Sequence, residues 1–324
     1  MNVAVVVIVF FLLVVLLLLI HLTYRVEALR TMAQDADDPD DQIDQDDTTR
    51  ARLARTKNYV YAGLVLTIVL LVAIVYILLL GTPWSGHVHE WLNLIVRWMH
   101  ITFGIAWIGT SFYFVFLENA LNRTRNVRPE LAGNLWAVHG GGFYYLEKYK
   151  LAPATIPRDL HWFKYEAYFT WLSGFCLLAI VYYLDAHSFL IDPAVLPLTS
   201  GQAIGISVGS LMTGWIVYDR LCRSRLARNA TVFAITGFVL AVGLAMLYTA
   251  LFNSRAAYLH FGALLGTLMA ANVFFVIIPS QKAMVRAAKR GEDLDPDLGK
   301  HAGLRSLHNN YLTLPVLFVM ISNH

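Results

Sequence analysis

The chemistry available to this chain is concentrated in its 11 histidines, because few other ionisable groups fall inside its long apolar segments. His100 and His260 are expected in the outer half of those segments, with His324 as a reserve, and facing imidazoles are common axial ligands of haem iron. Arg97 stands three residues before His100, and Arg255 five before His260. Arginine pairs with carboxylates, so both are candidates to hold the propionates of a b-type haem. Interfacial histidines beside snorkelling arginines explain the pattern equally well.

A second group of histidines, His139, His161 and His308, is expected near the opposite side of the membrane. Histidine titrates near neutral pH, so each of the three is a candidate general base. His139 lies in the stretch NLWAVHGGGFYYLEKYK (134–150). Its three glycines permit positive φ angles and a nest of backbone N–H groups for an anion. A flexible aromatic loop is an equally open interpretation of this stretch.

The residues beside this second group would suit a planar, anionic ligand that forms hydrogen bonds. Tyr165 and Glu166 begin an apolar helix, and an acidic residue one turn into a membrane helix is a functional candidate. Pairing of Glu166 with a neighbouring arginine would explain it equally well. Asn309, Asn310 and Tyr311 follow His308 directly. All five are therefore predicted to bind substrate.

The elements that must position these side chains are membrane helices. Of 324 residues, 57% are hydrophobic and 15% charged, and the mean hydropathy is +0.55. Soluble domains carry about 25% charged residues, so a soluble protein is excluded. Apolar segments occur at roughly 3–20, 59–80, 95–117, 165–184, 202–218, 231–251, 257–279 and 311–324. The predicted fold class is an all-α, polytopic helical membrane bundle of about eight segments, the last truncated within a helix.

Charge in the connections predicts the orientation of these helices. The connections 21–58, 118–164, 219–229 and 280–307 hold 23 of the 25 Lys and Arg residues. The alternate connections hold only Arg97 and Arg255. Basic connections stay in the cytoplasm, so these four are predicted inside and the N-terminus outside.

Composition also divides the chain and removes several classes of function. We expect residues 1–58 to form one transmembrane helix plus an acidic cytoplasmic loop, and residues 59–324 the membrane core. The stretch 34–47 carries eight aspartates and is predicted to be disordered. The two cysteines form no CxxC or CxxCH motif, which argues against a thiol redox centre, a zinc knuckle or a covalent c-type haem. The net charge of +3 gives no support to a nucleic-acid partner.

Three stretches together resemble a known family. They are EWLNLIVRWMHITFGIAWIGTSFYFVFLENAL (90–121), WAVHGGGFYYLEKYK (136–150) and LHNNYLTLPVLFVMISNH (307–324). The combination resembles the membrane domain of the bacterial urate hydroxylases, or cytochrome-c-linked urate oxidases. The resemblance runs from about residue 90 to the end, and the first two helices lie outside it.

The resemblance implies oxidation of urate to 5-hydroxyisourate in purine degradation, in the bacterial inner membrane. It implies that electrons pass to a c-type cytochrome, periplasmic or fused, which this sequence does not encode. It does not carry over catalytic residues, so the residues named above rest on their types and positions alone. The alternative class is a transporter for a purine or a metal ion. Against it, the sequence has no clear inverted repeat and no pair of interrupted helices.

Overall fold

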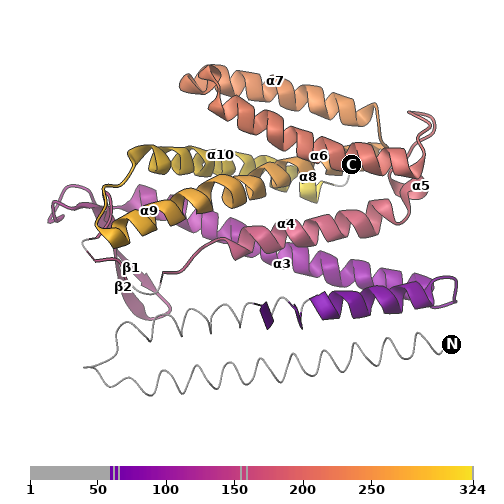
Figure 1. Ribbon diagram of the computed structural model, residues 1–324, viewed down its shortest axis with the longest axis horizontal. Coiled ribbons are helices and arrows are strands. Elements are labelled where there is room, and N and C mark those ends of the chain that lie inside the picture. Colours follow the sequence, from indigo (N-terminus) through magenta and orange to yellow (C-terminus); the bar gives the residue numbers. More distant parts are fainter. Residues whose placement is uncertain (1–58, 61–62, 65, 154, 158–159, 323–324) are drawn as a thin grey trace. The chain divides into compact units, whose positions relative to one another are not determined.

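The computed structural model is shown in Figure 1 and describes residues 59–60, 63–64, 66–153, 155–157 and 160–322. The predicted first segment (3–20), the acidic stretch 34–47 and His324 lie outside the described residues. So does the predicted domain 1–58, whose boundary therefore stays a prediction. The described residues form helices joined by turns, with one two-stranded hairpin. The predicted all-α helical bundle is confirmed.

The chain divides into two units, Met1–Trp91 and Leu92–His324. In the first unit, the predicted segment 59–80 contains the apolar helix Leu66–Leu79. A turn at Gly81, whose φ is +77°, ends this part of the chain. His89 lies on the next helix, where its Nδ1 is 3.4 Å from the Tyr76 hydroxyl.

Four described stretches are long and apolar enough to cross a membrane: Ser85–Ala120, Tyr165–Tyr183, Ala230–Thr249 and Ser254–Arg290. They confirm the apolar segments predicted at 95–117, 165–184, 231–251 and 257–279. The segments predicted at 202–218 and 311–324 lie on the helices α6 (Ser200–Arg223) and α10 (Pro296–Ile321). Because these two helices are more polar, their crossing of the membrane stays a prediction.

Two of these spans are single α-helices, α3 (Ser85–Ala120) and α7 (Ala230–Thr249). The other two change their helical pitch along their length. The second span joins α4 (Tyr165–Leu178) to the π-helix η1 (Ala179–Tyr183). The last span joins α8 (Ser254–Ala271), the π-helix η3 (Asn272–Ile277) and α9 (Ile278–Arg290). Shorter pieces are α5 (Ala186–Phe189) and the 3₁₀-helix η2 (Arg225–Arg228).

Side chains at the helix starts explain where the elements begin. Thr199 and Gln202 form a reciprocal capping box at α6. Asn229 and Asn253 accept hydrogen bonds from the first turns of α7 and α8. Asp295 caps α10, and Pro296 fills its first position, where a missing N–H costs nothing. Residues 296–307, expected in a connection, are therefore helical.

The stretch 134–150, for which a flexible loop is one of two open interpretations, lies in a hairpin. The strands β1 (Leu131–His139) and β2 (Gly142–Tyr149) pair antiparallel, with Trp136 opposite Tyr145 and Val138 opposite Phe143. Gly140 and Gly141 form the turn with φ of +58° and +80°. Two-residue hairpin turns of this kind require positive φ at both positions, which favours glycine. The positive φ expected for these glycines is confirmed, but the segment is an ordered ribbon.

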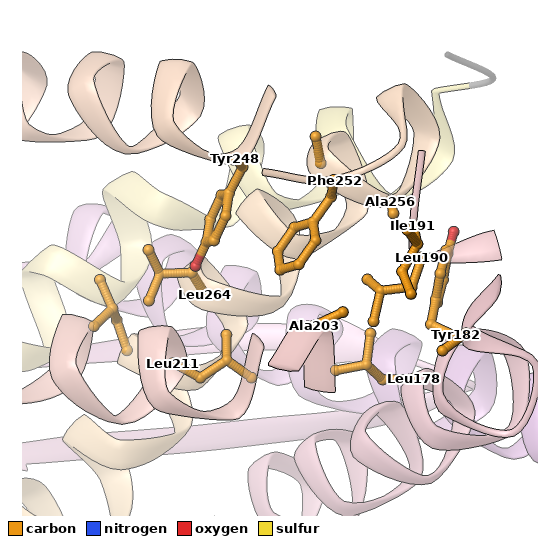
Figure 2. Close-up of a cluster of buried hydrophobic side chains, with 13 residues drawn as sticks. Leu178, Tyr182, Leu190, Ile191, Ala203, Leu211, Tyr248, Phe252, Ala256 and Leu264 are labelled. Atoms are coloured by element: carbon orange, nitrogen blue, oxygen red, sulfur yellow. The ribbon is translucent and has the colours of Figure 1, made fainter. Parts of the chain in front are cut away.

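The helix α8 is the centre of the second unit, since it contacts α4, α6, α7 and α10. Apolar side chains of α8 and of its neighbours form the cluster in Figure 2: Leu178, Tyr182, Leu190, Ile191, Ala203, Leu211, Tyr248, Phe252, Ala256 and Leu264. Within this unit, the connections α3–α4, α6–α7 and α9–α10 lie at one end, and α4–α6 and α7–α8 at the other (Figure 1). That is the alternation expected from the charges, while the side that faces the cytoplasm stays a prediction.

Candidate functional site

Three helices bring buried polar side chains together at the end of the second unit that carries the basic connections. They are α6, α10 and the π-helix η3, which starts at the fully buried Asn272. Pro279 follows η3 and has no N–H to give to the carbonyl one turn earlier, which helps to interrupt the α-helical pattern. Short π-helical insertions occur frequently at functional sites.

The centre of this site is Arg305, of which only 4% is exposed. Its Nη2 donates to Oδ1 of Asp219 at 2.6 Å, and its Nη1 donates to Oδ1 of Asn272 at 3.2 Å. Its guanidinium also lies 5.0 Å from the ring centre of Tyr218 and 5.8 Å from that of Trp215. A buried charge is stable only when it is paired and hydrogen-bonded, and here it is both.

The amide of Asn272 extends the network to α10 and α6. Arginine can only donate, so Oδ1 of Asn272 must face Arg305 and its Nδ2 must face the other side. Nδ2 is 2.9 Å from Oδ1 of Asn309 and 3.0 Å from the Tyr218 hydroxyl. Asn309 in turn donates to the Met269 carbonyl at 3.0 Å. We call Asp219, Tyr218, Asn272, Arg305, His308 and Asn309 the Arg305 network.

His308 ends this chain of hydrogen bonds. Its Nδ1 is 2.8 Å from the Tyr218 hydroxyl and 3.8 Å from the Cys222 sulfur, and its ring stacks on Phe233 with centres 4.8 Å apart. The Tyr218 oxygen accepts from Asn272, and its best acceptor within reach is the imidazole rather than a thiol. Tyr218 therefore donates to Nδ1, and the proton of a neutral His308 lies on Nε2.

The Nε2 atom of His308 has no partner among the described residues. Among the described residues, Oε2 of Glu166 is the one buried side-chain nitrogen or oxygen atom without a hydrogen bond. Because the Nε2 of His308 also has no partner there but is not such a buried atom, it must be accessible. It presents an N–H to whatever approaches from the open side.

Of the residues predicted to bind substrate, the structure brings Asn309 into the network with His308. Arg305, His308 and Asn309 share a helical face at positions i, i+3 and i+4. Asn310 is half-buried, and Tyr311 points away with 72% of its surface exposed.

The other candidate bases lie apart from the network in the described contacts. His139 is exposed at the end of β1, next to the turn. His161 is exposed and packs edge-on against Phe163, with ring centres 4.5 Å apart. Their roles as bases stay predictions.

Glu166 and Tyr165 begin α4 but differ in burial. Tyr165 is 53% exposed, and the Lys164 ammonium lies 4.7 Å from its ring centre. Oε2 of Glu166 is buried and has no hydrogen-bond partner in the described part of the chain. The expected arginine partner of Glu166 is thus not seen there, and a functional role for this carboxyl stays a prediction.

Elsewhere in the second unit, one ring nitrogen of His100 is hydrogen-bonded and the other is not. Its Nδ1 is 3.0 Å from the Thr170 carbonyl, which can only accept, so Nδ1 carries the proton. The ring lies against Gly174, where an added Cβ would come within 2.8 Å of its Cε1. Nε2 is left unprotonated and without a partner among the described residues. A ring oriented by a backbone carbonyl is typical of metal-ligating histidines.

His260 has no open nitrogen. It is fully buried, and its Nδ1 is 2.7 Å from the Ala256 carbonyl, so Nδ1 donates. Its Nε2 accepts from Ser207 at 2.6 Å, and Ser207 lies 2.7 Å from the Tyr183 hydroxyl. The imidazole packs against three aromatic rings, those of Tyr182, Tyr248 and Phe252. We call Tyr182, Tyr183, Ser207, Tyr248, Phe252 and His260 the His260 cluster.

A haem between His100 and His260 does not fit this arrangement. His100 contacts α4, whereas His260 faces Ser207 of α6 and lies among tightly packed rings. Arg97 is exposed and bonded to Asn93, and Arg255 is also exposed. His324 lies outside the described residues. The haem ligands stay a prediction, and among the described candidates only His100 has the geometry of one. Groups of three His, Cys, Asp or Glu side chains that could hold a metal ion by themselves are not found in the described residues.

Sequence reasoning misses four of the six residues of the Arg305 network. Arg305 and Asp219 fall within predicted connections, and neither Asn272 nor Tyr218 is singled out. The signal that finds Arg305 is the Asp295–Pro296 helix start, which extends α10 backwards over residue 305. Asn272 has no such signal, because its partners come from other helices.

Fold and site together define a helical membrane protein with a buried polar network near one end of its bundle. Residues 86–324 match the urate oxidase N-terminal family, and the chain belongs to that family. The match covers the region from about residue 90 whose motifs resemble urate oxidases. No curated protein and no solved structure matches the chain. Membership in this family suggests a urate-related oxidoreductase.

Proposed function

We propose that this chain is the membrane part of an enzyme that oxidises urate to 5-hydroxyisourate and delivers the electrons to a c-type cytochrome. The family match supports urate as the substrate. The observation that carries the proposal is the Arg305 network, which presents the Nε2–H of His308 beside the ring of Phe233. An N–H donor beside an aromatic face suits a planar anion with carbonyl oxygens.

The reaction adds water to urate and removes two electrons and two protons. Urate and water give 5-hydroxyisourate, and two molecules of oxidised cytochrome c each take one electron. The protein must therefore bind a planar anion, accept or pass on protons, and keep the site accessible to water.

The ring nitrogen of His308 that carries the proton decides whether His308 donates a hydrogen bond to the substrate or accepts one. With Nδ1 occupied by Tyr218, His308 donates from Nε2 to an oxygen or an unprotonated nitrogen of the substrate. It serves as a base only after Tyr218 turns its hydroxyl away. Tyr218 and Asn272 act through His308 and are therefore positioning residues.

The route of the electrons from urate to the cytochrome stays a proposal. A b-type haem would supply one-electron steps between substrate and cytochrome. His100 is the residue whose open Nε2 fits ligation, and Arg97, three residues earlier on α3, could hold a propionate. For His260 to ligate the iron as well, its Nε2 would first have to lose its hydrogen bond with Ser207.

The test uses the protein in bacterial membranes, with urate loss and reduction of added cytochrome c followed together. We expect His308→Ala to remove most of both signals. The matched control is His301→Ala, which changes an exposed histidine of the same helix and should keep both. Full activity of His308→Ala would remove the Arg305 network from the reaction. Wild-type membranes that take up urate without oxidising it would instead favour a transporter.

A further inference from the structure

The hairpin carries an apolar face that nothing in the described structure covers. Side chains of paired strands alternate between faces, so Trp136, Val138, Phe143 and Tyr145 share one face. Their exposed fractions are 67%, 67%, 79% and 46%. Exposed apolar side chains are ordinary on membrane spans, but this hairpin lies between two spans, after Ala120 and before Tyr165. A contiguous apolar patch outside the spans marks an interaction site.

The hairpin is fixed to the end of α3. Asn122, just after α3, exchanges two backbone hydrogen bonds with Asn134 of β1, at 2.8 and 3.0 Å. Their side chains are joined as well, Nδ2 of Asn122 to Oδ1 of Asn134 at 3.1 Å. Lys148 of β2 pairs with Glu118 on the last turn of α3. These bonds fix the ribbon to the C-terminal end of α3.

Basic side chains lie at the open end of the hairpin, away from its turn. Residues 118–151 contain five Lys or Arg and three Glu, which leaves a net positive charge. Arg128 sits between Glu130 and Glu147, and the Glu147 carboxylate raises its pKa, so it stays charged. Arg123 donates from Nη2 to the backbone carbonyl and the carboxylate of Glu118, and Lys150 donates from Nζ to the Pro129 carbonyl, while both side chains remain exposed.

We propose that this hairpin is a membrane-surface anchor, whose apolar face enters the headgroup region of the bilayer beside α3. Trp and Tyr concentrate at that depth because their rings are apolar while their N–H and O–H groups need water. Phe143 and Val138, nearest the turn, would reach the boundary of the acyl chains. The basic side chains would face anionic headgroups, which attract Lys and Arg close to the surface.

The occupant is lipid rather than protein because the hairpin is fixed to the end of a candidate membrane span, so that the bilayer would lie beside it without any binding event. Its composition, with Trp and Tyr on one face and basic residues at its open end, is that of the interfacial belt of membrane proteins. This inference does not depend on the proposed function.

The test places a nitroxide spin label on each face of the hairpin and measures its collisions with oxygen and with a water-soluble nickel chelate. The background protein carries Cys176→Ser and Cys222→Ser, which remove its two cysteines. Labels at Val138→Cys and Phe143→Cys report on the apolar face. The matched controls are their chain neighbours Ala137→Cys and Tyr144→Cys, which lie on the opposite face. The protein is held in lipid nanodiscs with and without anionic lipid.

We expect the ratio of oxygen to nickel collisions to be several-fold higher at positions 138 and 143 than at 137 and 144. The difference should grow with anionic lipid. Equal, nickel-accessible labels on both faces would show that the apolar face lies in water and overturn the proposal. Labels at 138 and 143 shielded from both reagents would also overturn it, since a protein segment would then cover the face. The two reporter positions lie on different strands, so misfolding of one variant leaves the other to decide.

Discussion

The Arg305 network and the His260 cluster each hold a histidine beside tyrosine, yet they leave that histidine in different hydrogen-bonding states. In the His260 cluster both ring nitrogens are bonded and three aromatic rings close around the imidazole. In the Arg305 network one nitrogen of His308 is bonded and the other is open. A histidine that is fully satisfied and packed stabilises a fold, whereas one oriented through a single nitrogen can bind a ligand with the other.

The source of the orientation also differs between the two regions. His260 is oriented by a backbone carbonyl of its own helix, and this bond forms whenever the helix forms. His308 is oriented by Tyr218, which is oriented by Asn272, which is oriented by Arg305. Because the second chain of bonds crosses three helices, it is assembled only in the folded bundle. The predictions below probe that difference.

The largest expected effect comes from breaking the buried ion pair. Arg305→Ala leaves Asp219 without its buried partner and should destabilise the protein by about 3–5 kcal/mol. Arg223→Ala is the matched control, since Arg223 bonds the same carboxylate at 2.8 Å but is 69% exposed. An exposed pair is worth about 0–1 kcal/mol. Unfolding followed by tryptophan fluorescence in detergent checks both values, and equal losses would show that burial of Arg305 is not the cause.

Ser207→Ala tests whether the His260 cluster is structural. It leaves Nε2 of His260 buried without a donor, at a cost of about 1–3 kcal/mol. The rate of urate oxidation per folded molecule should not change, because the cluster is closed. A parallel optical spectrum gives a second outcome. If Ser207→Ala instead strengthens a haem signal, Nε2 of His260 is a ligand that Ser207 blocks in this conformation.

Gly174→Ala tests the position of His100. The new Cβ would lie 2.8 Å from Cε1 of His100, so the ring or the helix must shift. Overpacking of this kind costs about 1–3 kcal/mol. Gly205→Ala is the control, because nothing lies within 4 Å of its added Cβ. Gly205 lies inside α6, where replacement of glycine by alanine should be neutral or stabilise the protein by up to about 1 kcal/mol. If both variants behave alike in thermal unfolding, His100 does not rest on Gly174.

The sequence determines the helices better than it determines the site. Long apolar runs give α3, α4, α7 and α8 directly, because a membrane span is a local property of about 20 residues. The hairpin is missed because three glycines among aromatic residues are as compatible with an anion-binding nest or a flexible loop as with a turn between two strands. The partners of Arg305 are missed for a different reason. Each lies on another helix, and no local pattern records which helix faces pack together.

The smallest expected effect on stability, and the most informative, is that of Tyr218→Phe. The ring keeps its packing against Arg305, so the loss should be about 1–2 kcal/mol, from unpaired groups on Asn272 and His308. The proton of His308 is then free to move to Nδ1, which leaves Nε2 able to accept. If His308 works as a donor to the substrate, urate oxidation should fall and the Michaelis constant should rise, because binding has lost its N–H. If His308 works as a base, the same change should keep or raise the turnover number. Comparing both kinetic constants of Tyr218→Phe with those of the exposed-face control His301→Ala separates the two roles.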